Sequence, residues 1–296
     1  METEQRTGTV HYLLLTTAVI GISFSAILIR LTTAPPVIVA VYRLLFSLIF
    51  ILPILISKKE WRSNHLRAQH IFWAILSGLC LALHFFTWIT SLQLTSVVSS
   101  VVLVTMQPIF TLLAGHFFLG EKVTTKELIG VGIALSGALI LTGSDAIIIS
   151  GKTLSGNGLA FLSSIFYAGY LLLGRWLRRH INLWIYVSLV YGVATSLLVV
   201  TGLMLKIPLY PYPCSDYLLL FLLAAVSTLG GHTVFNWLLG YLPVGIISVS
   251  ILGEPVGATI LAFLILQEIP IYGQILGGIL VLIGIGWFLM GKRGNG

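Results

Sequence analysis

Charged residues are scarce in this sequence. Only 8% of its 296 residues are Asp, Glu, Lys or Arg, whereas 57% are hydrophobic and the mean hydropathy is +1.04. Soluble domains carry about 25% charged residues, so this composition excludes an ordinary soluble protein and predicts an integral membrane protein. The net charge of +7 does not indicate a nucleic-acid partner, because the basic residues cluster at the ends of apolar segments.

Motifs that carry chemistry are also lacking. The two cysteines, Cys80 and Cys214, have neither metal-ligand spacing nor a convincing disulfide framework. The sequence has no G-x-x-x-x-G-K-[ST] phosphate loop, no H-E-x-x-H zinc motif and no convincing Ser/His/Asp cluster. We therefore expect no enzymatic activity, no cofactor and no metal site, and ATP-driven transport would need a partner subunit.

What the sequence has instead is long apolar runs. A helix that crosses a membrane needs roughly 20 mostly apolar residues, and about ten runs of this length leave little chain for a soluble domain. The first run has no small-residue cleavage site after it, so we expect it to be retained as a helix. The expected fold is an all-α integral membrane protein with ten transmembrane helices, at about 10–29, 36–56, 70–91, 96–118, 125–144, 156–176, 183–205, 217–240, 244–266 and 271–290.

Lysine and arginine are distributed unequally between alternate loops. If the N-terminus is cytoplasmic, 12 of these residues lie on the cytoplasmic side, 3 lie on the other side and one, Arg43, lies within a span. Cytoplasmic loops are enriched in Lys and Arg, so we expect both termini to be cytoplasmic and the protein to lie in the cell membrane (inner or plasma membrane). The cytoplasmic set is Arg6, Lys58, Lys59, Arg62, Arg67, Lys122, Lys126, Arg175, Arg178, Arg179, Lys292 and Arg293, and the other set is Arg30, Lys152 and Lys206.

The chain also repeats itself. Residues 104–141 align with residues 250–287 at a near-constant offset of 147, which pairs "QP" at 107–108 with "EP" at 254–255. One residue of slippage further back, "HFFTWITSL" (84–92) aligns with "HTVFNWLLG" (232–240). Each unit holds five helices, and an odd number makes the second copy cross the membrane in the opposite sense. We therefore predict one membrane domain made of two inverted five-helix repeats, residues 1–146 and 147–296, an architecture typical of secondary transporters.

Two ionisable residues, Arg43 and Glu254, lie deep within the expected spans. Such residues are costly in lipid and are candidates for function. Arg43 either lines or gates a site, or it snorkels or forms a structural ion pair inside the protein. Glu254 lies near the membrane midplane, where it either lines a cavity or is a neutral, hydrogen-bonded residue at a packing kink. Pro255 and its counterpart Pro108 each remove an amide donor and should kink their helices, which is tolerated where the backbone lines a cavity or is buried in protein.

Two histidines, His84 and His232, occupy near-equivalent positions in the repeat. Trp88, Asn236 and Trp237 lie about one turn further on, on roughly the same faces. These residues either line a cavity or are satisfied core residues, and no carboxylate or cysteine shares their helical spacing to make a metal site. The residues that we expect to line the substrate cavity are Arg43, His84, Trp88, Gln107, Tyr167, His232, Asn236, Trp237 and Glu254.

Two further features recur in both halves. Glu121 and Glu268 each lie at a helix end, either as solvated caps or inter-helix hydrogen-bond partners, or as substrate ligands. The glycines of "GVGIALSGALILTG" and "GQILGGILVLIGIG" should permit close contact between the final helices of the two repeats.

These motifs carry a family resemblance. In each repeat a helix contains a proline, then an apolar stretch and L-x-E, as in "QPIFTLLAGHFFLGEK" and "EPVGATILAFLILQEIP", and a Gly-rich helix follows. Together with "APPVIVAVYRLLFSLIFILP" they resemble the EamA-type branch of the drug/metabolite transporter superfamily over essentially the whole chain. The resemblance implies ten helices, termini inside and alternating access. It also implies transport of small metabolites such as amino acids, or of drugs, usually outward and often coupled to a proton or an exchanged solute.

The leading hypothesis is a secondary transporter with a central cavity between its two halves. Glu254 would bind a proton and couple its entry to substrate exit, and Arg43 would hold a substrate carboxylate or pair with Glu254. One alternative is a passive channel or facilitator, whose flux would neither saturate nor respond to a pH gradient. Another is a membrane-embedded enzyme or lipid-handling protein, which would need a catalytic cluster that the sequence does not show. The expected partners are a small-molecule substrate and the lipid bilayer, with oligomeric state left open.

Overall fold

The computed structural model describes residues 8–58, 66–142, 151–267 and 269–293, and these residues form helices without any β-strand. The first expected repeat contains α1 (Thr9–Leu31), α2 (Pro36–Lys58), α4 (Ala68–Leu94), α5 (Val97–Val104), α6 (Gln107–Leu119) and α7 (Thr125–Thr142). The second contains α8 (Gly151–Arg178), α9 (Leu183–Met204), α10 (Cys214–Leu222), the π-helix η1 (Leu223–Thr233), α11 (Val234–Leu238), α12 (Val244–Ile251), α13 (Glu254–Leu266) and α14 (Tyr272–Arg293).

Nine helical segments within the described ranges are long and apolar enough to cross a membrane. They correspond to nine of the ten expected spans, with α5–α6, α10–η1–α11 and α12–α13 each forming one segment. The remaining expected span, 125–144, coincides with α7, whose 18 residues end at the edge of a range that the structure does not describe. The all-helical membrane fold is confirmed, whereas the count of ten spans and the cytoplasmic termini stay predictions.

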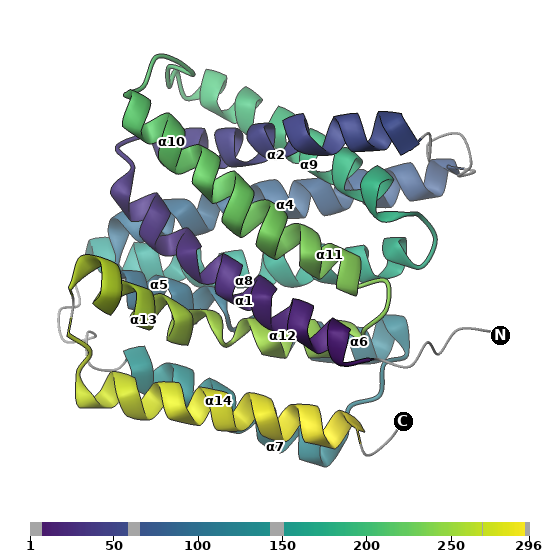
Figure 1. Cartoon of the computed structure of the whole chain (residues 1–296), viewed down its shortest axis with the longest axis vertical. Coiled ribbons are helices and arrows are strands. Elements are labelled where there is room, and N and C mark those ends of the chain that lie inside the picture. Colours follow the sequence, from purple (N-terminus) through teal and green to yellow (C-terminus); the bar gives the residue numbers. More distant parts are fainter. Residues whose placement is uncertain (1–7, 59–65, 143–150, 268, 294–296) are drawn as a thin grey trace.

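The helices lie side by side, and consecutive spans run in alternating directions (Figure 1). α1 begins and α14 ends at the same end of the bundle, on the right of the view, which we call the proximal end. α1 ends and α2 begins at the opposite, distal end. The orientation expected from the loop charges would make the proximal end cytoplasmic.

The packing has the symmetry of the repeat. α4 packs along α8, and its counterpart in the second half, η1, packs along α1 in the same way. α4 also packs on α9 while η1 packs on α2, and the matched helices α2 and α9 contact each other, as do α7 and α14. Exchange of the two halves therefore leaves the pattern of contacts nearly unchanged, as expected for a chain made of two similar halves. The expected boundary between them, at residues 146 and 147, lies outside the described residues.

Four glycines hold α7 and α14 in direct backbone contact. A Cβ atom at Gly137 would lie 2.6 Å from the backbone nitrogen of Val281, and one at Gly130 would lie 2.6 Å from that of Phe288. Their repeat counterparts, Gly277 and Gly284, face backbone atoms of α7 in the same manner. Because no side chain fits at these positions, the glycines allow the two helices to pack as closely as small residues permit in membranes.

Two spans are broken at matching positions, and a third contains a π-helix. Residues 105–106 separate α5 from α6, and residues 252–253 separate α12 from α13, again at an offset of 147. Pro108 and Pro255 lie in the first turns of α6 and α13, where a missing amide costs little because those amides have no intrahelical partner. η1 adds 11 residues of π-helix, a form with i→i+5 hydrogen bonds that is often found at functional sites.

Candidate functional site

The two broken spans meet at the centre of the bundle. The side-chain amide Nε2 of Gln107 donates to the carbonyl of Ser248 at 3.2 Å, and Thr111 Oγ1 donates to Ser248 Oγ at 2.8 Å. These bonds join the start of α6 to the middle of α12. Gln107 is fully buried, so its interaction ties the two halves together at the break rather than opening toward a substrate.

A small polar cavity lies beside this crossing. Seven residues surround a cavity of about 10 Å³, far smaller than the ~300–1,000 Å³ of typical ligand pockets. Four of the seven are aromatic or histidine, and they come from both halves of the protein. The cavity is therefore closed around its polar groups, and a substrate would need the surrounding helices to separate. The lining residues are Ser25, His84, Trp88, Val104, Tyr167, His232 and Glu254.

His84 anchors an aromatic stack within the cavity wall. Its Nδ1 lies 2.8 Å from Ser163 Oγ and 3.3 Å from the Ser163 carbonyl oxygen. Because a carbonyl only accepts, and Ser163 Oγ itself donates to the His84 carbonyl at 3.0 Å, we assign the proton to Nδ1 and leave Nε2 as an acceptor. The imidazole stacks on Tyr167 with ring centroids 4.4 Å apart and lies parallel to Trp88 at 6.0 Å.

Several polar atoms of the wall have no hydrogen-bond partner among the described residues. These buried atoms are Ser25 Oγ, Trp88 Nε1, Tyr167 Oη and His232 Nδ1. An unsatisfied buried polar group costs about 1–3 kcal/mol, and buried polar groups that stay unpaired call for a functional explanation. Three of the four carry hydrogens that can donate, so the wall is suited to a ligand that offers acceptor atoms.

Arg43 is a fully buried cation beside this wall. Its Nε donates to Thr228 Oγ1 of η1 at 3.2 Å, and its Cζ lies 4.0 Å from the centre of the Phe85 ring. Phe85 in turn contacts His232, with ring centroids 5.3 Å apart. The terminal nitrogens Nη1 and Nη2 have no partner among the described residues. A guanidinium stays charged even when buried, so the fold holds a positive charge with two unused nitrogens near the cavity.

Glu254 begins α13 and is 5% exposed, with that small surface opening into the cavity. Its backbone carbonyl accepts from Ser23 Oγ of α1 at 3.5 Å. Within the described part of the chain, no donor or cation bonds to its carboxyl group. Arg43 and Glu254 are near enough to interact electrostatically, but no ion pair joins them. In this structure the acid and the base are separate groups on one site.

Two further residues expected to line the cavity, Asn236 and Trp237, lie elsewhere. Asn236 Oδ1 accepts from Tyr170 Oη at 2.8 Å, and Asn236 Nδ2 donates to Tyr191 Oη at 3.3 Å, within a buried network. Trp237 stacks on His11 at the proximal end, with ring centroids 5.4 Å apart and planes 11° apart. Ser25 was not expected from the sequence, although it and Ser23 are the polar residues of the stretch 18–29 of α1.

Glu121 is an inter-helix partner at the proximal end. Its carboxylate accepts from Arg175 Nε of α8 at 2.9 Å, lies 3.5 Å from Arg179 Nη2, and accepts from the backbone N–H of Val244 at 2.9 Å. Val244 is the first residue of α12, where the helix dipole favours a negative charge. One carboxylate thus joins the end of α6 to α8 and α12. Its expected counterpart, Glu268, lies outside the described residues.

A bundle of apolar helices with a polar cavity between two similar halves is an architecture typical of membrane transporters. The EamA-like transporter family matches residues 9–143 and, a second time, residues 154–290. The chain therefore belongs to the EamA-like transporter family. It is a multi-pass protein of the cell membrane and a transporter rather than an enzyme.

Individual proteins agree with this assignment. The chain is 24% identical over 275 residues to the uncharacterized transporter YoaV of Bacillus subtilis (strain 168), covering 91% of this chain and 92% of YoaV. It is 34% identical over 82 residues, 28% of this chain, to 73% of a probable 4-amino-4-deoxy-L-arabinose-phosphoundecaprenol flippase subunit ArnE from Hamiltonella defensa subsp. Acyrthosiphon pisum (strain 5AT). A crystal structure of another protein matches 98% of this chain and 100% of its own with TM-score 0.76 and 16% identity, which shows the fold alone.

Proposed function

We propose that this transporter is a secondary exporter of a small metabolite that carries a carboxylate group, such as an amino acid, with transport coupled to a proton. The observation that carries the proposal is the buried guanidinium of Arg43, whose Nη1 and Nη2 are unpaired beside a cavity that also contains an unpaired carboxyl group. Arginine binds a carboxylate through two parallel N–H···O bonds. A buried cation with two free nitrogens is therefore suited to that ligand.

The acidic and aromatic groups of the site would bind the part of the substrate beyond its carboxylate. Glu254 can accept an ammonium group, and the stacked rings of His84, Tyr167 and Trp88 offer faces for an aromatic or cationic part. Together the groups match a zwitterion, with an anionic end toward Arg43 and a cationic end toward Glu254. Because the present cavity has a volume of only about 10 Å³, binding requires a state in which the two halves stand further apart.

Proton coupling would follow from competition at one carboxyl group. Glu254 can hold either a proton or a cationic substrate group, so binding of one favours release of the other. The repeat places neutral Gln107 at the equivalent position of the first half, where it is bonded to Ser248. Only one of the two symmetric positions can therefore exchange a proton, which supports a single coupling site.

Transport by purified protein in liposomes tests the proposal. A thermal-shift screen against metabolites first supplies a substrate, since a ligand stabilises the protein according to its concentration relative to Kd. We expect Arg43→Gln to abolish saturable transport, Arg43→Lys to retain part of it, and Lys152→Gln at the exposed start of α8 to behave as wild type. Glu254→Gln should still exchange substrate but lose its response to a pH gradient.

Two outcomes would contradict the proposal. If Glu254→Gln keeps the wild-type response to a pH gradient, Glu254 is not the coupling group. If wild-type flux does not saturate and ignores both the pH gradient and a counter-substrate, the protein is a passive facilitator, which is the alternative function.

A further inference from the structure

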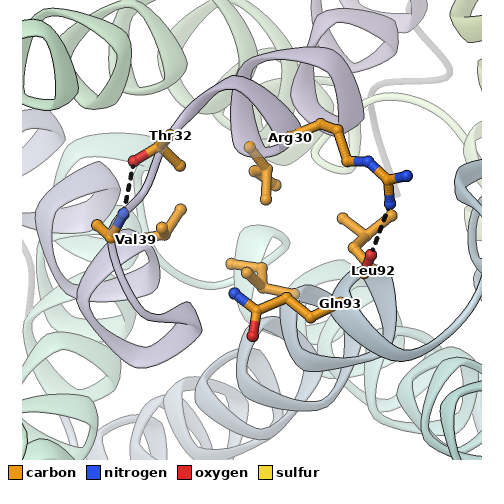
Figure 2. A pocket seen from close by; sticks show the side chains of 8 residues that line it. Arg30, Thr32, Val39, Leu92 and Gln93 are labelled. Carbon is orange, nitrogen blue, oxygen red and sulfur yellow. Dashed lines mark hydrogen bonds between the residues drawn. The ribbon is translucent and has the colours of Figure 1, made fainter. Parts of the chain in front are cut away.

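A second space lies at the distal end, between the end of α1, the start of α2 and the end of α4. Its volume is about 280 Å³, against about 10 Å³ for the central cavity. Figure 2 shows its polar side chains around the opening, with Arg30 on one side and Gln93 on the other. Five apolar residues, among them Ile29, Val39 and Ile89, and three polar residues, Arg30, Thr32 and Gln93, line it.

The pocket continues the walls of the central cavity. Ser25 lines the cavity on α1, and Ile29 lines the distal pocket on the same helix. On α4 the corresponding residues are Trp88 and Leu92. Residues four apart share one face of a helix and lie about 6 Å apart along its axis. The distal pocket therefore lies one helical turn beyond the cavity, on the same two helices.

Arg30 lies at the edge of this pocket and makes one hydrogen bond there. Its Nη1 donates to the Leu92 carbonyl at 3.0 Å and so joins α1 to α4 (Figure 2). That carbonyl belongs to the last turn of α4, whose dipole attracts a cation. Arg30 is exposed, and a guanidinium has five N–H donors. It can therefore bind an anion while the link to Leu92 is kept or exchanged.

The other lining groups restrict what the pocket can hold. Arg30 is the one charged residue among those that line it, so no carboxylate competes for its guanidinium there. Asp216, an acid at the same end, is bonded to the backbone N–H and the hydroxyl of Thr33, at 3.2 and 2.7 Å. One cation over apolar side chains fits an anion with an apolar part.

We propose that the distal pocket is a second binding site for the transported solute, taken as an organic carboxylate with an apolar portion, and that Arg30 is its anion contact. This inference rests on the proposed function, because it places the site on the path of the same substrate. The carboxylate would pass from Arg43 to Arg30, with Gln93 available as a neutral hydrogen-bonding group. An anionic lipid headgroup with its acyl chain shares this chemistry, so the experiment separates the two sources.

Equilibrium dialysis of labelled octanoate tests the site on full-length protein in nanodiscs of phosphatidylcholine. We expect two sites in wild type and in Lys152→Gln, a same-end charge control. One site should remain in Arg43→Gln and one in Arg30→Gln, with Kd raised at least tenfold at the altered site. Arg30→Lys, which keeps the charge, should retain the distal site and shows that loss in Arg30→Gln is not a folding defect.

Three results would overturn the inference. The first is a single site in wild type, and the second is full binding in Arg30→Gln. The third is loss of the distal octanoate site when phosphatidylglycerol is added to the nanodisc, which would assign the pocket to lipid. A different result would contradict the proposed function alone. In that case the distal site binds octanoate, but liposomes show no saturable, gradient-coupled transport.

Discussion

The two ends of the bundle are built by related sequences but are closed to different degrees. At the proximal end, Glu121 bonds to Arg175 and to the start of α12, and Arg175 Nη1 donates to the Leu239 carbonyl at 2.6 Å. At the distal end, the carbonyl of Leu92, one residue beyond the repeat counterpart of Leu239, receives one bond from Arg30 beside a pocket of about 280 Å³. The corresponding helix ends are thus joined by a largely buried ionic cluster at one end and by a single hydrogen bond from an exposed arginine at the other.

This difference indicates which conformation the structure represents. Two inverted halves can exchange conformations, so that a central site opens to each side in turn. A state with a tight proximal joint and a loose distal joint is closed on the proximal side. In the proposed alternating-access mechanism, the opposite state would require the Glu121 cluster to separate.

The largest loss of stability is expected from a substitution in the contact between α7 and α14, which belongs to neither joint. Gly137→Leu places a side chain against the backbone of Val281, where even a Cβ would lie at 2.6 Å. We expect the free energy of unfolding to fall by about 3 kcal/mol, as for severe overpacking. The fall is measured as a lower midpoint of thermal unfolding in detergent. Gly132→Leu on the same helix, with no atom within 4 Å of its Cβ position, should cost little. Equal midpoints for the two variants would contradict the close packing of α7 and α14.

Glu121→Gln should weaken the proximal end specifically. The substitution removes the negative charge that pairs with buried Arg175 and accepts from the amide of Val244. We expect the free energy of unfolding to fall by about 2 kcal/mol, because breaking a buried charge pair leaves the partner uncompensated. Hydrogen exchange of residues 236–246 should become faster, while exchange of residues 28–38 stays as in wild type. Faster exchange at both ends to the same extent would show that Glu121 does not act locally.

Arg30→Gln should have a smaller effect on stability. Arg30 is exposed, and interactions of exposed charges contribute about 0–1 kcal/mol. The unfolding midpoint should therefore stay close to wild type and well above that of Glu121→Gln. If Arg30→Gln destabilises the protein as much as Glu121→Gln, the two joints are of equal strength and the comparison fails.

The smallest effect concerns the caps that end the matched helices α6 and α13. Gly120 has φ 67°, and its repeat counterpart Gln267 has φ 58°, a left-handed conformation that costs a non-glycine residue roughly 1–2 kcal/mol. Gln267→Gly should stabilise the protein by about 0.5 kcal/mol. Glycine relieves the left-handed conformation, but its greater freedom in the unfolded chain cancels part of that gain. Gly120→Gln should destabilise it, and a change in the same direction for both variants would contradict the strain.

Much of the fold could be predicted because the two halves of the sequence align with each other. The offset of 147 fixed the pairs of proline breaks and of packing glycines, and apolar runs located the spans. His84 and His232 could be assigned to one cavity because they occupy near-equivalent positions in the repeat, and both line it.

The sites around η1 could not be predicted in the same way. The expectation that Asn236 shares a face with His232 assumes 3.6 residues per turn, whereas η1 is a wider π-helix that shifts the phase of the residues that follow. Trp237 accordingly lies on His11 at the proximal end. Gln107 is polar like Glu254, but its partner, the Ser248 carbonyl, becomes apparent only where the two broken spans cross. The distal pocket depends on three helix ends that are far apart in sequence.

Cysteine labelling at the proximal and distal joints tests the central claim most directly. Leu92→Cys and Leu239→Cys are introduced separately into protein whose Cys80 and Cys214 are replaced by serine, and labelling by a water-soluble maleimide is followed in nanodiscs, where both ends face solvent. We expect Cys at position 92 to react much faster than Cys at position 239, and Glu121→Gln to accelerate labelling at 239 and slow it at 92. Equal rates at the two positions, or no change with Glu121→Gln, would contradict a protein closed at its proximal end by the Glu121 cluster.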